Sequence, residues 1–198
     1  MKLQKSQTTV AEILRAAGRL FAQYGYYHTS MADILQAVSL SKGAFYYHFR
    51  SKEELGLAIL EQMAQDYRRE LFDPVLSITL PGSRLREMFF RVVHLNQGPE
   101  WYNCLLLARL AQDMGQEEGR LKLKLAENVD TLVRFWEELI HDARRADKLK
   151  PNLEPRPLAE LIVAGLFGAL LFRELPPPAV RLEDVADSLQ RLILLETL

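Results

Sequence analysis

The chain has 198 residues, of which 48% are hydrophobic and 26% are charged, and its formal net charge is −1. This composition is that of a folded globular protein and excludes a disordered, collagen-like or disulfide-stapled chain. The single cysteine, Cys104, cannot form an intramolecular disulfide, which indicates a reducing, cytoplasmic location. The N-terminus lacks the apolar run of a signal peptide. The longest apolar stretch, residues 158–172, contains Glu160, and we expect it to be too short to span a bilayer. We therefore expect no membrane partner.

The near-zero net charge conceals an asymmetry along the chain. Residues 1–52 carry seven basic and two acidic side chains, a net charge of +5, whereas the remainder carries −6. A basic N-terminal quarter on an acidic body predicts a local module that binds a polyanion. The alternative is an ordinary solvated face, because charge clusters on protein surfaces often have no ligand.

The first predicted helix follows from apolar residues that recur at helical spacing from Val10 to Tyr24. Thr9 and Glu12 have the spacing of a capping box, so we expect the helix to begin there. Gly25 is expected to end it, because glycine tolerates the left-handed conformation that follows many helices.

Two short helices are predicted next, over residues 31–38 and 42–48, joined by a turn at residues 39–41. Ser30 is expected to cap the first and Ser41 the second. Two short helices joined by a three-residue turn have helix-turn-helix geometry. A plain helical corner with surface tyrosines is the alternative.

The second short helix has two different faces. Phe45 and Phe49 are four residues apart and are expected to point into the core, which leaves Gly43, Tyr46 and Tyr47 outside. Exposed adjacent tyrosines are costly unless they touch a partner. Because no carboxylate occupies the third helical position, the helix N-terminus is expected to attract phosphate.

The sequence predicts that the rest of the chain is also helical. Ser51 and Glu54 form a capping box that opens a long helix to about residue 72, where Asp73 and Pro74 are expected to stop it. Five further helices are predicted near residues 83–96, 101–114, 119–146, 157–175 and 182–195. The fold class is therefore all-α, with one domain over residues 1–52 and a second over residues 53–198.

Two segments of the sequence resemble a known protein family. Residues 21–34 (FAQYGYYHTSMADI) and 39–55 (SLSKGAFYYHFRSKEEL) resemble the tetracycline-repressor (TetR) family of transcriptional regulators. The resemblance covers about residues 10–60. It implies three N-terminal helices that bind double-stranded DNA, a linking fourth helix, and a divergent helical domain for a small-molecule ligand and for dimerisation. We expect no cofactor and no metal.

The resemblance also implies roles for individual residues of the head. The expected contacts to base edges in the major groove come from Lys42, Gly43, Ala44 and Tyr46. The expected contacts to phosphates come from Thr29, Ser30, Tyr47, His48 and Lys52. Ala44 departs from relatives with a polar residue there, so readout is expected to depend on Lys42 and Tyr46.

A ligand pocket would have to lie among the later helices. Candidate wall residues, each of which could equally be core packing, are Phe89, Val93, Trp101, Tyr102, Cys104, Leu107, Met114, Phe135, Trp136 and Phe167. The segment from residue 103 to 110 resembles the start of the sixth helix in electrophile- and acrylate-responsive members of the family. Cys104 is therefore a reactive sensor, an unreactive pocket wall or plain core, and its residue type alone leaves all three open.

The last two helices are expected to form a dimer interface, since two helices from each chain would build a four-helix bundle. The expected interface residues are Leu158, Leu161, Ile162, Gly165, Leu166, Ala169, Phe172, Leu182, Val185, Leu189, Leu192 and Ile193. The alternative is a monomer that buries both apolar stripes internally.

These observations favour a ligand-responsive transcriptional regulator, most simply a repressor that binds a palindromic operator as a homodimer and is released by a small apolar or electrophilic inducer. A rival class is an enzyme, but the four histidines show no metal-ligand spacing and no phosphate-binding loop or nucleophile elbow is present. We expect no catalytic residues. A third class is a helical adaptor with a degenerate DNA-binding head.

Overall fold

The computed structural model describes residues 2–98, 103–114, 119–150, 153–173, 175–176 and 179–195. These ranges are almost entirely helical, and their only β-type pairing is an isolated bridge between Leu149 and Leu194. The helices are α1 (Lys2–Tyr24), α2 (Met31–Val38), α3 (Lys42–His48), α4 (Lys52–Tyr67), the π-helix η1 (Arg68–Phe72), α5 (Asp73–Leu76), α6 (Pro81–Leu95), α7 (Asn103–Asp113), α8 (Arg120–Arg145), α9 (Pro155–Phe172) and α10 (Leu182–Ile193).

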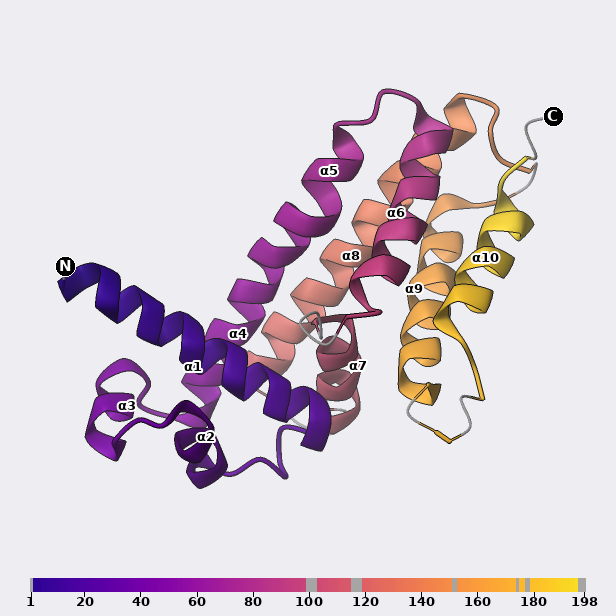
Figure 1. The fold of residues 1–198 in the computed structure, drawn as a ribbon. Helices are drawn as coiled ribbons and strands as arrows, with labels where there is room; N and C mark the ends of the chain where they lie inside the picture. Colours follow the sequence, from indigo (N-terminus) through magenta and orange to yellow (C-terminus); the bar gives the residue numbers. More distant parts are fainter. Residues whose placement is uncertain are drawn as a thin grey trace.

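Helices α1, α2 and α3 form a head at one end of the molecule, and α4 to α10 form the body (Figure 1). Helix α4 leaves the head and runs along the body, continued by η1 and α5. The long helix α8 packs against α4, α6, α7 and α9, and α10 lies against α6 and α9. The chain thus places α3 at one end and the pair α9–α10 at the other (Figure 1).

The caps of the short helices are formed as the sequence predicts. The Ser30 hydroxyl accepts from the Asp33 N–H while the Asp33 carboxylate accepts from the Ser30 N–H, a reciprocal capping box. The Ser41 hydroxyl accepts from the Ala44 N–H at 3.2 Å, and Ser51 caps α4 in the same way. The predicted bounds of α2 and α3 are confirmed, because these caps and the left-handed Ser39 between them are local features.

Two predicted helix ends are wrong. Helix α1 begins at Lys2, so Thr9 and Glu12 lie inside it and form no cap; no proline or glycine precedes them to interrupt the helix. Asp73 and Pro74 do not stop α4, because the chain widens into the π-helix η1 and continues as α5. In this wider turn the Asp73 N–H donates to the Arg68 carbonyl, five residues back, which accommodates the proline ring.

Helix α9 is longer than the apolar stretch suggested. It has 18 residues and is, by length and composition alone, able to cross a membrane, which corrects the expectation that this segment is too short. Nearly half of it is buried, against α8 and α10 among other elements. A core helix of a globular protein passes the same test of length and composition.

Candidate nucleic-acid interface, effector core and dimer surface

Helix α3 has a buried face and an open face, as its sequence predicts. Phe45 and Phe49 are buried in the head, with their rings 6.0 Å apart. The outward face carries exposed residues, namely Lys42, Gly43, Ala44, Tyr46 and Tyr47. Tyr47 is 83% exposed, and a Cβ added to Gly43 would have no neighbour within 4 Å. The structure therefore leaves this face of α3 free for a partner.

Thr29 has a structural role that the sequence analysis did not predict. Its side chain is buried, and its hydroxyl donates to the carbonyls of Gly25 at 2.8 Å and Leu20 at 3.3 Å. The hydroxyl therefore fastens the loop between α1 and α2 and does not reach a phosphate, which corrects the expectation for Thr29. The neighbouring Ser30 hydroxyl is exposed but is engaged with the Asp33 carboxylate at 2.6 Å, and these hydrogen bonds lower the pKa of Asp33.

The Lys52 side chain lies over two aromatic rings of the head. Its Nζ lies 4.4 Å from the ring centre of Tyr26 and 5.9 Å from that of Phe21, a cation–π arrangement. Burial lowers the pKa of Lys52, and the charges of Asp113 and Asp33 partly oppose that shift. The phosphate contact expected of Lys52 stays a prediction. His48 is half-buried, with its ring 5.1 Å from that of Tyr47.

The body contains an aromatic core between α4, η1, α6 and α8. Phe72 of η1 stacks on Phe135 of α8 at 4.0 Å and lies 6.4 Å from Tyr67, ring centre to ring centre. Phe89 of α6 lies 4.7 Å from Trp136 of α8. Tyr67 and Phe72 were not predicted from the sequence, because only the tertiary structure brings the end of α4 onto α8.

Tyr67 also contacts the single cysteine. The Tyr67 hydroxyl donates to the Cys104 Sγ at 4.0 Å, and complete burial raises the pKa of Tyr67 well above its usual value of 10.0. Cys104 is itself buried, with 2% of its surface exposed. The thiol therefore lies within the aromatic core and not at the surface.

The predicted pocket residues fall into several groups. Phe89, Cys104, Leu107, Phe135 and Trp136 are buried in the body, whereas Val93 and Phe167 are partly buried. Trp101 and Tyr102 lie outside the described residues. Met114 is buried at a different place, because its Sδ accepts from the Tyr27 hydroxyl of the head at 3.6 Å. The expectation that Met114 lines the same pocket as Phe89 is therefore corrected: Met114 belongs to the contact between body and head.

The predicted dimer residues divide between two faces of α9 and α10. Seven of them face the protomer's own core: Leu158, Ile162, Leu166, Ala169, Leu182, Leu189 and Ile193. Their assignment to an interface between chains is therefore corrected. Gly165 also belongs to the internal contact, since a Cβ there would lie 3.5 Å from Leu189.

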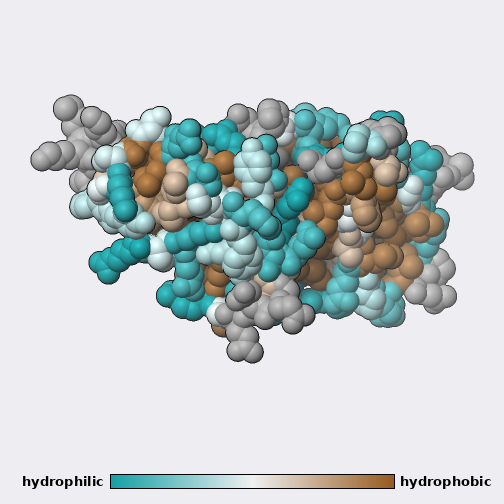
Figure 2. Space-filling view, turned by 90° about the horizontal axis from the view of Figure 1, so that it is seen from below, coloured by the Kyte–Doolittle hydropathy of each residue, from teal (hydrophilic) through white to brown (hydrophobic). Residues whose placement is uncertain are grey.

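The exposed remainder forms an apolar surface. Leu161, Phe172 and Leu192 are 57%, 53% and 63% exposed, and Val185 is half-buried between the two helices. A Cβ added to Gly168 would meet nothing within 4 Å. Figure 2 shows hydrophobic residues gathered at the end of the molecule where α9 and α10 lie. Such a contiguous apolar surface is typical of an interaction site.

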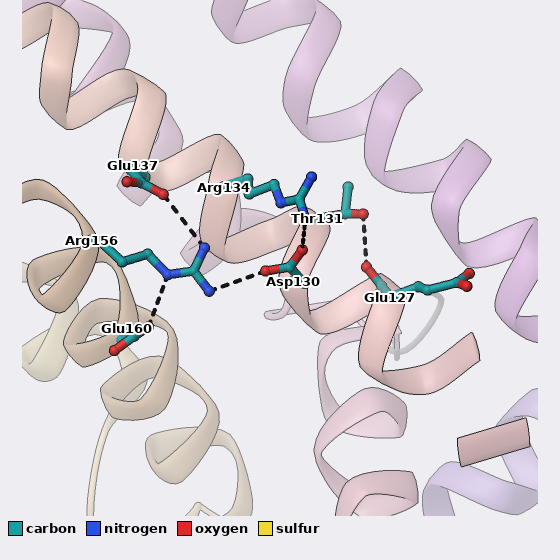
Figure 3. A network of polar contacts seen from close by, with 7 residues as sticks. All are labelled: Glu127, Asp130, Thr131, Arg134, Glu137, Arg156 and Glu160. Carbon is teal, nitrogen blue, oxygen red and sulfur yellow. Dashed lines mark hydrogen bonds and ion pairs between the residues drawn. The ribbon is translucent and has the colours of Figure 1, made fainter. Parts of the chain in front are cut away.

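A polar network fastens the start of α9 to α8 (Figure 3). The Arg156 guanidinium donates to Glu160 at 2.8 Å, to Asp130 at 3.1 Å and to Glu137 at 3.5 Å. Asp130 also pairs with Arg134 at 2.6 Å, and these cations lower the pKa of Asp130. The network links the start of α9 to α8, two helices that also pack against each other. Within the described ranges, no three His, Cys, Asp or Glu side chains gather where they could hold a metal ion.

Comparison with known proteins gives consistent matches. Residues 13–59 match the family model "Bacterial regulatory proteins, tetR family", and residues 81–189 match "Tetracyclin repressor-like, C-terminal domain". The transcriptional regulator AcuR of Cereibacter sphaeroides is 30% identical over 162 residues, which cover 80% of this chain and 73% of AcuR.

Solved structures share the fold over nearly the whole chain. A TetR-family regulator of Agrobacterium tumefaciens has a TM-score of 0.87 at 20% identity and covers 96% of this chain and 100% of its own. AibR, solved in complex with isovaleryl coenzyme A and operator DNA, has a TM-score of 0.72 at 23% identity, covering 92% of this chain and 96% of its own.

Proposed function

This chain belongs to the TetR family of transcriptional regulators, and on that premise we propose that it is a repressor that binds a palindromic operator as a homodimer and leaves it when a small molecule binds. Members of the family are DNA-binding regulators rather than enzymes, and they are typically ligand-responsive repressors. In the proposal residues 1–52 bind DNA, residues 53–198 bind the effector and the second chain, and the protein works in the cytoplasm.

The observation that carries the proposal is the open face of α3 on a basic head. Lys42, Gly43, Ala44 and Tyr46 lie together on a helix that Phe45 anchors from behind, so the helix can enter a major groove without losing its core contacts. The Lys42 ammonium can donate to guanine O6 and N7, and the Ala44 methyl can contact a thymine methyl. Tyr47 and His48 are proposed to contact phosphates, which positions the helix without specifying sequence, whereas the Ser30 hydroxyl and N–H both donate to Asp33.

Dimerisation is proposed through the exposed apolar surface of α9 and α10. Leu161, Phe172 and Leu192 would be buried when these two helices meet the same two helices of a second chain, and Gly168 would allow close approach. A two-fold interface of this kind is self-complementary. It would present two α3 helices to half-sites about one helical turn or somewhat more apart.

The effector is proposed to be small and largely apolar. The aromatic core around Tyr67, Phe89 and Trp136 offers mainly ring faces, with the Tyr67 hydroxyl as a polar group. Pockets for apolar ligands are usually lined by residues of this kind, with a few polar groups. Because Cys104 is buried in that core, we propose that it is an unreactive wall residue rather than an electrophile sensor.

The test is sequence-specific DNA binding by the full-length protein. A duplex would be selected from a randomised library with the wild-type protein, and its affinity would be compared with that for random duplex at moderate salt. We expect a ratio of at least about 10³, the lower end for specific DNA-binding proteins. Equal affinity for selected and random duplex would contradict the proposal and favour an adaptor.

A further inference from the structure

A carboxylate at the end of α7 reaches from the body into the head. The Asp113 Oδ2 accepts a hydrogen bond from the backbone N–H of Tyr26 at 2.6 Å, although the two residues are 87 apart in sequence. Asp113 is the last residue of α7, where the helix dipole disfavours a negative charge. The Tyr26 N–H therefore gives this carboxylate a partner at a helix end that does not otherwise favour it.

The loop that receives Asp113 is shaped for this contact. Gly25 has a φ of +89°, and a Cβ added to it would lie 3.0 Å from the same Asp113 oxygen. Glycine is therefore required here both for the backbone conformation and for the close approach of the carboxylate. The adjacent contact between Tyr27 and Met114 extends the junction along the end of α7.

The ring of Tyr26 also contacts residues of α4 and α1. The Lys52 ammonium lies 4.4 Å from its centre, and the Phe21 ring packs edge-on at 5.1 Å. Tyr26 is thus the point where α1, α4 and α7 meet. The same helix α7 carries Cys104 at its other end, against Tyr67 in the aromatic core. Asp113 follows Cys104 by nine positions of helix, a rise of about 14 Å.

We propose that Asp113 is the positioning residue that sets the angle of the DNA-binding head on the body. Because α7 is a rigid connector between the aromatic core and Tyr26, the head orientation follows the position of α7. In the dimer this angle determines the half-site spacing that the two α3 helices accept. The inference rests on the proposed function for its DNA readout, but the contact itself is testable without DNA.

The first experiment measures the contact directly. The variants Asp113→Ala and Asp113→Asn are compared with Gln112→Ala, an exposed neighbour on the same helix. Amide hydrogen exchange by NMR should show the Tyr26 N–H exchanging at least about tenfold faster in Asp113→Ala, since one charge-assisted hydrogen bond is lost. Asp113→Asn retains a carbonyl acceptor and should keep most of the protection, and Gln112→Ala all of it. Unchanged Tyr26 exchange in Asp113→Ala would overturn the proposal.

The second experiment measures spacing. The selected duplex is prepared with one base pair inserted or removed between its half-sites, which displaces them by about 3.4 Å along the axis and rotates them. Wild type and Gln112→Ala should discriminate the native spacing from both altered ones, whereas Asp113→Ala should lose most of that discrimination and Asp113→Asn should retain it. Equal discrimination by Asp113→Ala and wild type would overturn the positioning role. If wild type binds no specific duplex, the proposed function fails, and the exchange measurement alone decides whether Asp113 holds the head.

Discussion

The Arg91 guanidinium donates a hydrogen bond from Nη1 to the main-chain carbonyl of Glu70, 3.0 Å away, where η1 passes into α5. In a regular α-helix that carbonyl would accept from residue 74, but Pro74 has no N–H. Arg91 of α6 donates to this carbonyl from its side chain and pairs with Glu87 on its own helix at 2.8 Å. The proline that the sequence suggested as a helix end is thus accommodated within a continuous helical segment by a side chain from another helix.

Replacing Arg91 should therefore destabilise the body. In Arg91→Met the Glu70 carbonyl loses its donor, and we expect the free energy of unfolding to fall by about 1–2 kcal/mol. Urea denaturation followed by circular dichroism measures the change. Arg86→Met, at an exposed position of the same helix, is the matched control and should change stability by less than about 0.5 kcal/mol. Equal effects of the two substitutions would contradict the bridging role of Arg91.

Lys42→Ala should weaken binding to the selected duplex by about 1–3 kcal/mol and relax the preference at one base pair. The reason is the loss of an ammonium that can donate to guanine on the open face of α3. Fluorescence anisotropy with single-base variants of the duplex measures both effects. Lys148→Ala removes the same charge from an exposed position of the body and should leave DNA binding unchanged. A uniform loss of affinity across all base variants in Lys42→Ala would instead assign Lys42 to a phosphate contact.

Replacing a leucine with glutamate should have different effects on two neighbouring helices. Leu192→Glu places a charge on the exposed apolar surface, so the chain should fold but sediment as a monomer and lose affinity for the selected duplex. Leu166→Glu places the charge in the protomer's own core, where an unpaired carboxylate is far more costly, so this variant should not fold. Analytical ultracentrifugation and circular dichroism separate the outcomes. A folded, dimeric Leu192→Glu protein would place the interface elsewhere.

Cys104 should resist thiol reagents in the folded protein. Only 2% of its surface is exposed, so a disulfide reagent must wait for an opening of the core. We expect native modification slower than that of the urea-unfolded chain by a factor of at least about 10². Cys104→Ser should release the selected duplex in response to an apolar inducer as wild type does. Rapid native modification, together with electrophile-induced release that Cys104→Ser loses, would restore the sensor hypothesis.

Alkaline pH should weaken the contact between head and body. Burial is the main cause that raises the pKa of Tyr26 from 10.0 to about 12, with smaller contributions from Tyr27 and Glu53. The unfolded chain therefore loses this proton first, so the stability contributed by neutral Tyr26 is complete below pH 10 and is lost as the pH rises toward about 12. The difference in unfolding free energy between wild type and Tyr26→Phe, measured across this range, should shrink as pH rises. A difference in unfolding free energy that stays constant with pH would contradict this prediction.

The local features of the head could be predicted from the sequence. Ser30 and Ser41 each bond to an N–H three residues on, so the bounds of α2 and α3 depend on residues that are neighbours in the chain. The inward direction of Phe45 follows from helical spacing in the same way. The family resemblance of residues 10–60 agrees with the matched family model over residues 13–59.

The contacts between residues far apart in the chain could be known only from the tertiary structure. The helical period marks both Leu166 and Leu192 as apolar, but the packing of α10 on α9 decides that one is buried and the other exposed. From the sequence alone Lys52 is interpreted as a surface cation, whereas in the structure its ammonium lies over the ring of Tyr26. Asp113 carries no local signal, because its partner lies 87 residues away. Periodicity and capping describe interactions within about one helical turn, whereas these roles come from contacts made only when separate helices pack.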